Sequence, residues 1–442
     1  MASTYLTKTF TASNRKTFTI STWVKRSALT VNNTIYAAGT NDATDRDYFV
    51  FLQDSGEEDK LYFNAKVSNS AVAQFYTTRR FRDTSAWYHI VLAFDTTQAT
   101  DTNRMKLYVN GEQQTYQSVT YPSQNQDMNT NNTVHTIGST VGPGQYFNGL
   151  MSHFHFIDGT AYPASTFGST DSTTGIWKIN TSPTVTYGTN GFFILKNGNG
   201  VTDQSGNSNN FTVGAGQITD LKDNPSNNFC NINLLYNQTT GQGVTVNNCG
   251  NTVYYASDSS RSCFGSIAPS SGKYYFECKV FDKTRAVIGI VNMAWDSING
   301  ASGYGYHDSA LNFGYDLDGN KTSGGSASSF GSALNNNDIV QVAMDLDNSK
   351  LYFGINGTWQ SSGDPTSGST GTGSAYNLVS GANYTGACRL RAGTQLGFNF
   401  GNGQYSGSSV VASEGTNASG IGKFEYDVPT GYTALSTKGL NE

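Results

Sequence analysis

The stretch that decides the fold reads WYHIVLAFD at residues 87–95 and continues, after a short polar loop, as MKLYVNG at residues 105–111. The first segment is a nearly continuous apolar run of strand length, which indicates a deeply buried β-strand. The second ends at Asn110-Gly111, and both of these residues tolerate the positive φ of a tight hairpin turn. The stretch therefore predicts strands and a hairpin turn.

A second copy of this pattern lies about 250 residues further along the chain. It reads DIVQVAMD at residues 338–345 and LYFGING at residues 351–357, again ending in Asn-Gly. A resemblance at such a distance, seen only twice, predicts two related domains rather than a solenoid of short repeats.

Other segments have the same character. Residues 16–24 alternate, with Phe18, Ile20 and Val24 on one face, and predict a half-buried strand. Further strands are expected at 147–157, 273–280 and 285–291, and no segment has the periodicity of a long helix. We predict an all-β protein made of two antiparallel jelly-roll β-sandwiches joined by an ordered connector.

The composition agrees with this fold class. Charged residues make up 13% of the 442 residues, about half of the usual ~25%, while aromatic residues also make up 13% and Gly contributes 49 residues. Such a mixture suits many short strands with Gly-containing and Asn-containing turns. The net charge of −5, without a basic stripe, disfavours nucleic acid as a partner. We expect neither a signal peptide nor membrane insertion, because no long apolar run occurs.

The segments divide into domains as follows. We expect the first sandwich at 1–168, a connector rich in Asn, Gly and Ser at 169–227, the second sandwich at 228–435 and a C-terminal tail at 436–442. The connector contains GFFIL at 191–195, an apolar group that free linkers seldom carry. We therefore expect it to add a strand to one of the sheets.

Several motifs resemble known families. FTISTWVKRS, WYHIVLAFDTT and IGSTVGPGQYFNGLMSHFHFIDGTAYPASTFG, which lie within about 10–168, resemble the laminin-G-like, concanavalin A-type jelly roll. SGKYYFECKV, NDIVQVAMDLDNSKLYFGINGTW and LRAGTQLGFNFG, within about 228–405, resemble a SPRY domain. The connector between them is similar to those of tail-fibre and other virion proteins of marine bacteriophages. The resemblance implies a phage structural protein, although a fold by itself does not define a function.

The sequence gives no support for catalysis. Concanavalin A-type glycosidases need two carboxylates at a defined separation, commonly in the pattern E-x-D-x-x-E, and this pattern does not occur. The acidic cluster Glu57-Glu58-Asp59 is contiguous and predicts a solvated hairpin tip. The sequence motifs of serine hydrolases, zinc proteases and nucleotide-binding proteins are also missing. We expect a non-enzymatic protein without a cofactor.

Metal sites are also not expected. Asp316-Leu-Asp-Gly-Asn320 imitates half of a calcium loop but lacks its last acidic ligand, and a hairpin turn is the preferred interpretation. Asp42, Asp45 and Asp47 lie where laminin-G-like domains sometimes bind calcium, but they form no complete site. His153 and His155 share one face of a predicted strand, and a solvent-exposed face or a protein contact is favoured over a metal.

The five cysteines are widely spaced and contain no C-x-x-C pair. Neither a zinc site nor a disulfide framework is expected from this spacing. We expect buried, reduced thiols.

Sugar binding requires little more than an exposed aromatic platform with polar groups around it. Tyr304 and Tyr306 lie in a Gly-flanked loop, and Trp359 follows the turn at Asn356-Gly357. These three residues are our candidates for a binding site. The alternative for each is core packing or anchoring of a loop.

Taken together, we expect a virion protein, assembled in the host cytoplasm, that displays loops for attachment to a host-surface glycan. Its partners would be other virion proteins, further copies of itself and that glycan. One alternative is a purely structural capsid decoration or tail adaptor without a glycan ligand. Another is a cellular SPRY scaffold that binds proteins.

Overall fold

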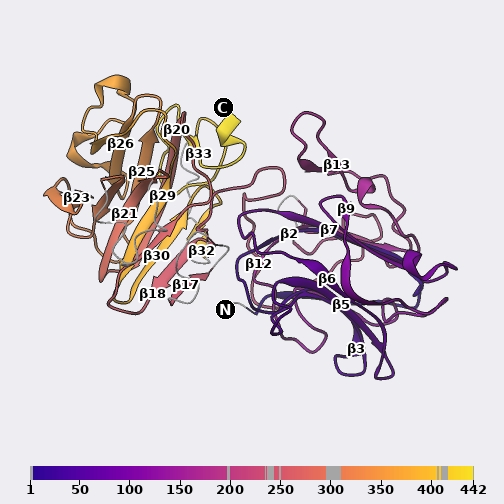
Figure 1. Cartoon of the computed structure of the whole chain (residues 1–442). Helices are drawn as coiled ribbons and strands as arrows, with labels where there is room; N and C mark the ends of the chain where they lie inside the picture. The colour runs from indigo at the N-terminus through magenta and orange to yellow at the C-terminus, as the bar shows by residue number, and fades with distance from the viewer. Residues whose placement is uncertain are drawn as a thin grey trace. The chain divides into compact units, whose positions relative to one another are not determined.

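The computed structural model describes residues 3–196, 200–233, 235, 243–247, 250–294, 310–405, 408–409 and 417–441. The chain forms two compact units, Met1–Asp220 and Leu221–Glu442, and each is described by itself (Figure 1). Both are built of β-strands, as expected. The helical turns within the described ranges are short 3-10 turns: η1 (Asp101–Asn103), η2 (Ala164–Thr166), η3 (Gln360–Ser362), η4 (Gly368–Thr370) and η5 (Gly439–Asn441). Among the described residues, no helix is long and apolar enough to cross a membrane.

The first unit contains two antiparallel sheets, which we call sheet A and sheet B. Sheet A has the order β10 (Tyr116–Thr120), β6 (Ser70–Arg80), β5 (Lys60–Val67), β4 (Asp45–Phe51), β3 (Asn33–Asn41), β11 (Val134–Ile137), β1 (Tyr5–Thr9) and β16 (Thr212–Ala215). Sheet B has the order β15 (Phe192–Ile194), β12 (Gly149–Asp158), β2 (Thr17–Arg26), β7 (Tyr88–Asp95), β8 (Met105–Val109) and β9 (Glu112–Gln113).

The main core of the first unit is formed by side chains from both sheets. On β7, Ile90, Leu92 and Phe94 belong to this core, whereas Val91 belongs to a second apolar cluster. The alternation follows from the strand period of two, which sends neighbouring side chains to opposite faces. Because Val91 is fully buried as well, the other face of sheet B must also be covered.

Residues 159–196, which we call the strap, provide this cover. The strap contains the hairpin β13 (Gly168–Thr170) and β14 (Trp177–Ile179), and its Phe167 and Trp177 belong to the cluster around Val91. The strap ends in β15, which pairs with β12, so this segment adds a strand to the sheet as expected. The expectation of a half-buried strand at 16–24 was wrong, because β2 is buried on both faces beneath the strap.

The expectation that Glu57-Glu58-Asp59 forms a solvated tip was wrong for Asp59. Its carboxylate is completely buried and lies 3.0 Å from Arg26 and 3.0 Å from Arg82. Glu58 pairs with Arg80 at 2.9 Å. The acidic cluster is thus held by Arg26 at the end of β2, Arg80 at the end of β6 and Arg82 just after β6. A buried carboxylate such as that of Asp59 needs cationic or hydrogen-bonding partners of this kind.

The second unit also contains two sheets, sheet C and sheet D. Sheet C has the order β17 (Val244–Asn247), β18 (Thr252–Tyr255), β30 (Thr394–Asn399), β20 (Lys273–Asp282), β25 (Ile339–Asp345), β26 (Lys350–Ile355) and β27 (Thr358–Trp359), with β28 (Tyr376–Asn377) on β26 and β33 (Thr433–Ala434) on β20. Sheet D has the order β19 (Arg261–Phe264), β29 (Tyr384–Arg391), β21 (Arg285–Asn292), β22 (Asn312–Asp316), β23 (Asn320–Ser323) and β24 (Ser326–Ser329). A short pair, β31 (Gln404–Tyr405) and β32 (Ser408–Ser409), lies apart from both.

The turns predicted from the sequence are present. Asn110 and Gly111 have φ values of 49° and 82°, and Asn356 and Gly357 have 49° and 85°, as a tight hairpin turn requires. The segment that imitates a calcium loop joins β22 to β23, and the Asp316 carboxylate accepts hydrogen bonds from the backbone of the turn.

Four of the cysteines lie in the described ranges and are buried free thiols, as expected: Cys230, Cys263, Cys278 and Cys388. All four contribute to the main core of the second unit. Cys249 lies outside the described residues.

Candidate functional site

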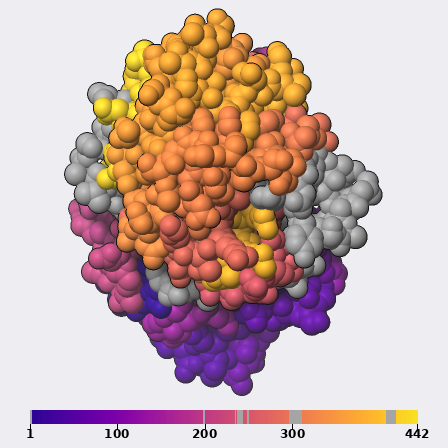
Figure 2. Space-filling view, turned by 90° about the vertical axis from the view of Figure 1, so that its left-hand side faces the viewer, coloured from indigo at the N-terminus to yellow at the C-terminus, as the bar shows by residue number. Residues whose placement is uncertain are grey.

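The outer face of sheet C is covered by residues 417–435, which we call the C-terminal segment. Its Phe424, Val428 and Tyr432 form a small second core with Tyr275 and Tyr352 of the sheet. In Figure 2 the yellow C-terminal residues lie along the edge of the orange surface formed by the middle of the unit. This covering segment creates the pockets described below.

A buried carboxylate anchors the C-terminal segment. Glu277 on β20 is completely buried and accepts hydrogen bonds from the backbone N–H groups of Glu425 (3.0 Å) and Tyr426 (2.9 Å). The hydroxyl groups of Tyr275 (2.9 Å) and Tyr405 also donate to it. Burial raises the pKa of Glu277, and these donors act in the opposite direction. The carboxylate thereby fixes the path of the segment across the sheet.

The larger pocket, which we call the Trp359 groove, is open and has a volume of about 600 Å³. One wall is the loop that follows β27, and the other is the C-terminal segment. It is lined by Trp359, Gly363, Asp364, Pro365, Thr366, Asn417, Ala418, Asp427, Val428, Pro429 and Thr430.

Trp359 is held in place by the turn that precedes it. The turn at Asn356-Gly357 returns the chain so that Trp359 pairs with Gly354 on β26. Its ring lies 6.5 Å from that of Tyr275 at 72°, an edge-to-face arrangement, yet the residue is only partly buried. One part of the ring therefore packs on the second core, while the residue also lines the groove.

The polar groups of the groove come from both walls. The Asp364 carboxylate is exposed and accepts hydrogen bonds at Oδ1 from the backbone N–H (2.8 Å) and hydroxyl (2.6 Å) of Thr366. These bonds lower the pKa of Asp364, which therefore stays ionised near neutral pH. Asp427, also exposed, supplies a second carboxylate from the opposite wall.

The loop that carries Asp364 and Thr366 is hydrogen-bonded to the C-terminal segment. The Tyr432 hydroxyl donates to the carbonyl oxygen of Pro365 at 3.0 Å. Since Pro365 lies between Asp364 and Thr366, this bond connects the two walls. A hydrogen bond thus holds the two walls of the groove in place relative to each other.

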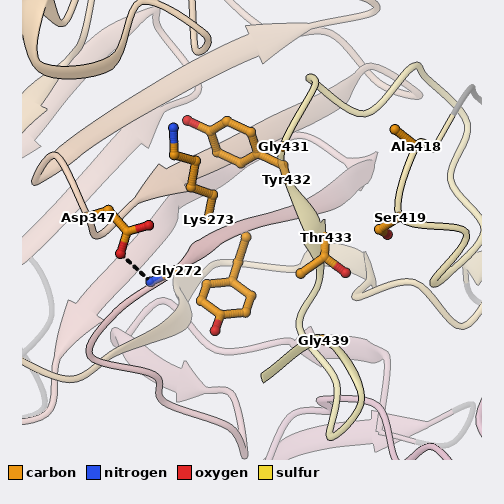
Figure 3. A pocket seen from close by; sticks show the side chains of 10 residues that line it. Gly272, Lys273, Asp347, Ala418, Ser419, Gly431, Tyr432, Thr433 and Gly439 are labelled. Atoms are coloured by element: carbon orange, nitrogen blue, oxygen red, sulfur yellow. Dashed lines mark hydrogen bonds between the residues drawn. The ribbon is translucent and has the colours of Figure 1, made fainter. Parts of the chain in front are cut away.

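A smaller pocket of about 340 Å³ lies on the other side of Ala418, which lines both pockets. Figure 3 shows the side chain of Lys273 next to the ring of Tyr432, and the Lys273 ammonium lies 5.8 Å from the ring centre. Lys273 also pairs with the buried carboxylate of Asp345 at 3.1 Å. Asp347 accepts a hydrogen bond from the Gly272 N–H at 2.7 Å. The Trp359 groove is the larger of the two pockets and contains Trp359, one of the residues predicted from the sequence, so it is the stronger candidate.

The structure places only one of the three predicted binding residues. Trp359 lines the groove, whereas Tyr304 and Tyr306 lie outside the described residues. Sequence reasoning missed Asp364 and Asp427. Asp364 follows Trp359 closely, in a loop at 361–374 that is rich in Ser, Gly and Thr, and this nearness was a usable signal. Asp427 is remote in sequence and becomes a neighbour only through folding.

The expectation of a solvent-exposed face for His153 and His155 was wrong, although a protein contact is present. Both side chains are buried beneath the strap, and His155 stacks on Phe193 with ring centres 3.8 Å apart. Burial lowers the pKa of His153 to about 4. A bulge in the pairing of β12 with β2 between Ser152 and His155 changes the simple alternation from which the exposure was predicted.

The three aspartates near the suspected calcium loop have other roles. Buried Asp47 accepts hydrogen bonds from Asn129 and Thr130, while Asp42 accepts two from the backbone at 141–142 and Asp45 accepts one from Ser68. Within the described part of the chain, no group of three or more His, Cys, Asp or Glu side chains could hold a metal ion.

Comparison with known families agrees with the two units. Residues 2–166 match the concanavalin A-like lectin/glucanases superfamily, and residues 273–403 match the SPRY domain family. The chain therefore contains a concanavalin A-like domain followed by a SPRY domain. The Trp359 groove uses Trp359 from within the SPRY match and residues 417–430 from beyond it.

Solved structures include similar SPRY domains. The SPRY domain of human HERC1 has 15% sequence identity over 38% of this chain and 96% of its own, with a TM-score of 0.30. Another human SPRY domain has 17% identity over 35% of this chain and 93% of its own, with a TM-score of 0.28. No curated protein matches the chain.

Proposed function

We propose that this chain is a non-enzymatic virion protein of a bacteriophage that attaches to a glycan on the host surface. Concanavalin A-like and SPRY domains favour binding or recognition. The similarity of the connector to those of phage virion proteins supports the setting, in which the chain assembles with further copies and with other virion proteins. The missing catalytic carboxylate pattern supports a role without turnover.

One observation carries the glycan part of this proposal. The partly buried Trp359 lines an open groove of about 600 Å³ that also contains carboxylate, amide and hydroxyl groups. A sugar presents an apolar C–H face and a rim of hydroxyl groups. A rigid aromatic ring with polar neighbours is the surface that complements both.

The test is binding of the purified protein to an array of bacterial surface polysaccharides. Trp359→Ala should weaken binding at least about thirtyfold, since a central aromatic anchor contributes ~2 kcal/mol or more. Trp359→Phe, which keeps a ring against Tyr275, should retain part of the affinity and most of the stability.

Tyr254 offers a matched control, because it is an exposed aromatic residue of the same unit that does not line the groove. Tyr254→Ala should bind as the wild type does. If the wild type binds no polysaccharide, or if Trp359→Ala binds normally, the structural decoration role is favoured instead. Release of sugar from any of the polysaccharides would contradict the non-enzymatic role.

A further inference from the structure

Two hydroxyl groups of the smaller pocket have no hydrogen-bond partner among the described residues. The parallel pairing of β33 with β20 places Thr433 opposite Tyr274, and both residues line the pocket. Thr433 is 6% exposed, and its Oγ1 atom is buried without a hydrogen bond. Within the described part of the chain, the Tyr274 hydroxyl also forms no hydrogen bond. Because buried polar groups are nearly always hydrogen-bonded, two such hydroxyls side by side point to a ligand.

The space beside both hydroxyls is kept open by glycines. A Cβ atom at Gly439 would lie 3.3 Å from the Thr433 Oγ1 atom, and one at Gly272 would lie 2.8 Å from the Tyr274 hydroxyl oxygen. Both glycines line the pocket (Figure 3). The volume of about 340 Å³ lies at the lower end of the range for small-ligand sites. The pocket therefore offers room for one small polar unit.

The charges of the pocket favour a neutral ligand that carries hydroxyl groups. Lys273 pairs with the buried carboxylate of Asp345 at 3.1 Å, so its charge is offset within the protein. The exposed Asp347 uses Oδ1 for the Gly272 N–H, and no donor among the described residues binds its Oδ2. Burial raises the pKa of Tyr274, and the nearby carboxylate of Asp347 raises it further, so the phenol keeps its proton. A carboxylate oxygen and two hydroxyls together complement the donors and acceptors of a sugar.

The smaller pocket adjoins the Trp359 groove. Ala418 of the C-terminal segment lines both, and its side chain is a single methyl group. A polysaccharide that lies in the groove therefore has a second pocket next to it on the surface of the same unit.

We propose that the smaller pocket is a second sugar subsite, which holds a further unit of the polysaccharide chain that contacts Trp359. This inference rests on the proposed function and deepens it, because it makes the length of the glycan a determinant of affinity. Tyr274, Thr433 and Asp347 bind the hydroxyl groups of the second unit.

The first experiment measures how affinity depends on chain length. The probes are oligosaccharides of one to six sugar units, prepared by partial hydrolysis of the polysaccharide that binds most tightly on the array. Calorimetry with the full chain should show that six units bind at least about tenfold more tightly than one, because linked units bind both sites together.

Variants assign part of this gain to the smaller pocket. Tyr274→Phe should reduce affinity for the six-unit oligosaccharide about threefold to tenfold and leave that for a single unit unchanged. Asp347→Asn should act in the same direction. Neither variant should change the melting temperature, because the Tyr274 hydroxyl and the Asp347 Oδ2 atom have no partner among the described residues. Tyr254→Phe changes an exposed tyrosine outside both pockets and is the matched control.

Methyl signals in nuclear magnetic resonance locate the sugar units directly. Thr366 lines the Trp359 groove and Thr433 lines the smaller pocket, so labelled threonine methyl groups report on each site separately. The six-unit oligosaccharide should shift both signals.

The outcomes separate this inference from the proposed function. A shift of the Thr366 signal alone, or unchanged affinity of Tyr274→Phe and Asp347→Asn for six units, would overturn the second subsite. If Trp359→Ala abolishes binding to the array in that case, the proposed function stands without the inference. If the wild type binds no polysaccharide, both are overturned.

Discussion

Glu277 shows how a single buried charge organises the region of the candidate site. The side chain is completely shielded from solvent. In place of water, two backbone N–H groups and two tyrosine hydroxyls donate hydrogen bonds to its carboxylate. Two of those donors belong to the C-terminal segment, which forms one wall of the Trp359 groove. Loss of the carboxylate would leave these donors buried without a partner, which is more costly than the loss of the bonds alone.

We expect Glu277→Ala to lower the free energy of unfolding by about 3–5 kcal/mol, because several buried donors lose their acceptor at once. Glu277→Gln should cost less, since the amide oxygen still accepts hydrogen bonds. Urea denaturation followed by tyrosine and tryptophan fluorescence measures both.

Asp318→Ala is the matched control, because Asp318 lies exposed in the turn between β22 and β23 and should change stability by less than about 0.5 kcal/mol. An equal, small effect of Glu277→Ala and Asp318→Ala would show that Glu277 does not anchor the segment.

At the scale of residues, the sequence could identify Trp359 but not its surroundings. A tryptophan just after an Asn-Gly turn is recognisable as a platform at the end of a hairpin. Asp427 was not recognisable, because nothing local distinguishes an exposed aspartate near the end of the chain from other solvated acids. Its significance comes from the path of the C-terminal segment, which the buried Glu277 determines.

At the scale of elements, the strap is the feature that the sequence pattern did not reveal. The alternation in residues 16–24 predicts a strand with one solvent-exposed face, because its second face contains Thr and Ser. In the structure that face is buried, because Phe167 and Trp177 of the strap cover sheet B. The polar side chains on it form hydrogen bonds with one another beneath the strap. The polarity pattern of a strand cannot reveal that a segment more than a hundred residues further along the chain will cover one of its faces.

Three histidines lie in this covered layer. His89 bonds with Ser21 (2.9 Å) and accepts from the Trp177 indole N–H (3.0 Å), while His155 bonds with the Tyr187 hydroxyl (2.9 Å). Burial lowers the pKa of His89 to about 3 and that of His153 to about 4, and the pKa of His155 is lowered for the same reason. The charge of Lys196 lowers the pKa of His153 and His155 further, and His153 and His89 also lower that of His155. Protonation of these histidines is therefore disfavoured while the strap is closed.

We therefore expect the strap to open more readily as the pH falls below about 6.5. A histidine released by opening regains an ordinary pKa near 6.5 and binds a proton that the closed state does not bind, so opening is favoured by acid. At pH 5 each released histidine should raise the opening equilibrium by at least about tenfold. Hydrogen exchange of residues 160–187, corrected for intrinsic rates, measures this from pH 7.5 to pH 5.

His155→Gln keeps a polar partner for Tyr187 but does not titrate, so its exchange should depend less on pH than that of the wild type. The core strands β3 and β4 serve as the internal reference, since their exchange should change less. Strap exchange that is independent of pH in the wild type would contradict the argument.

At the scale of the whole molecule, the chain carries two separate main cores, one for each compact unit. The sequence predicted this duplication from the repeated strand and Asn-Gly pattern, because each copy needs sheets of its own to bury its apolar run. The connector was harder to place from the sequence. Two of its short strands, β15 and β16, pair with β12 and β1, so these parts are built into the first unit.

This division leads to a prediction about fragments. Residues 212–220 are exposed, so a cut between Asp220 and Leu221 disturbs little buried structure. We expect fragments 1–220 and 221–442 to fold separately, each with a strand-type circular dichroism spectrum and a cooperative urea transition.

All lining residues of the Trp359 groove belong to the second fragment, and so does their anchor, Glu277. Fragment 221–442 should therefore bind the polysaccharides of the array as tightly as the intact chain, whereas fragment 1–220 should bind none of them in a way that depends on Trp359. If 221–442 folds but loses more than about tenfold in affinity, the groove alone is not the binding site, and the concanavalin A-like domain must contribute to it.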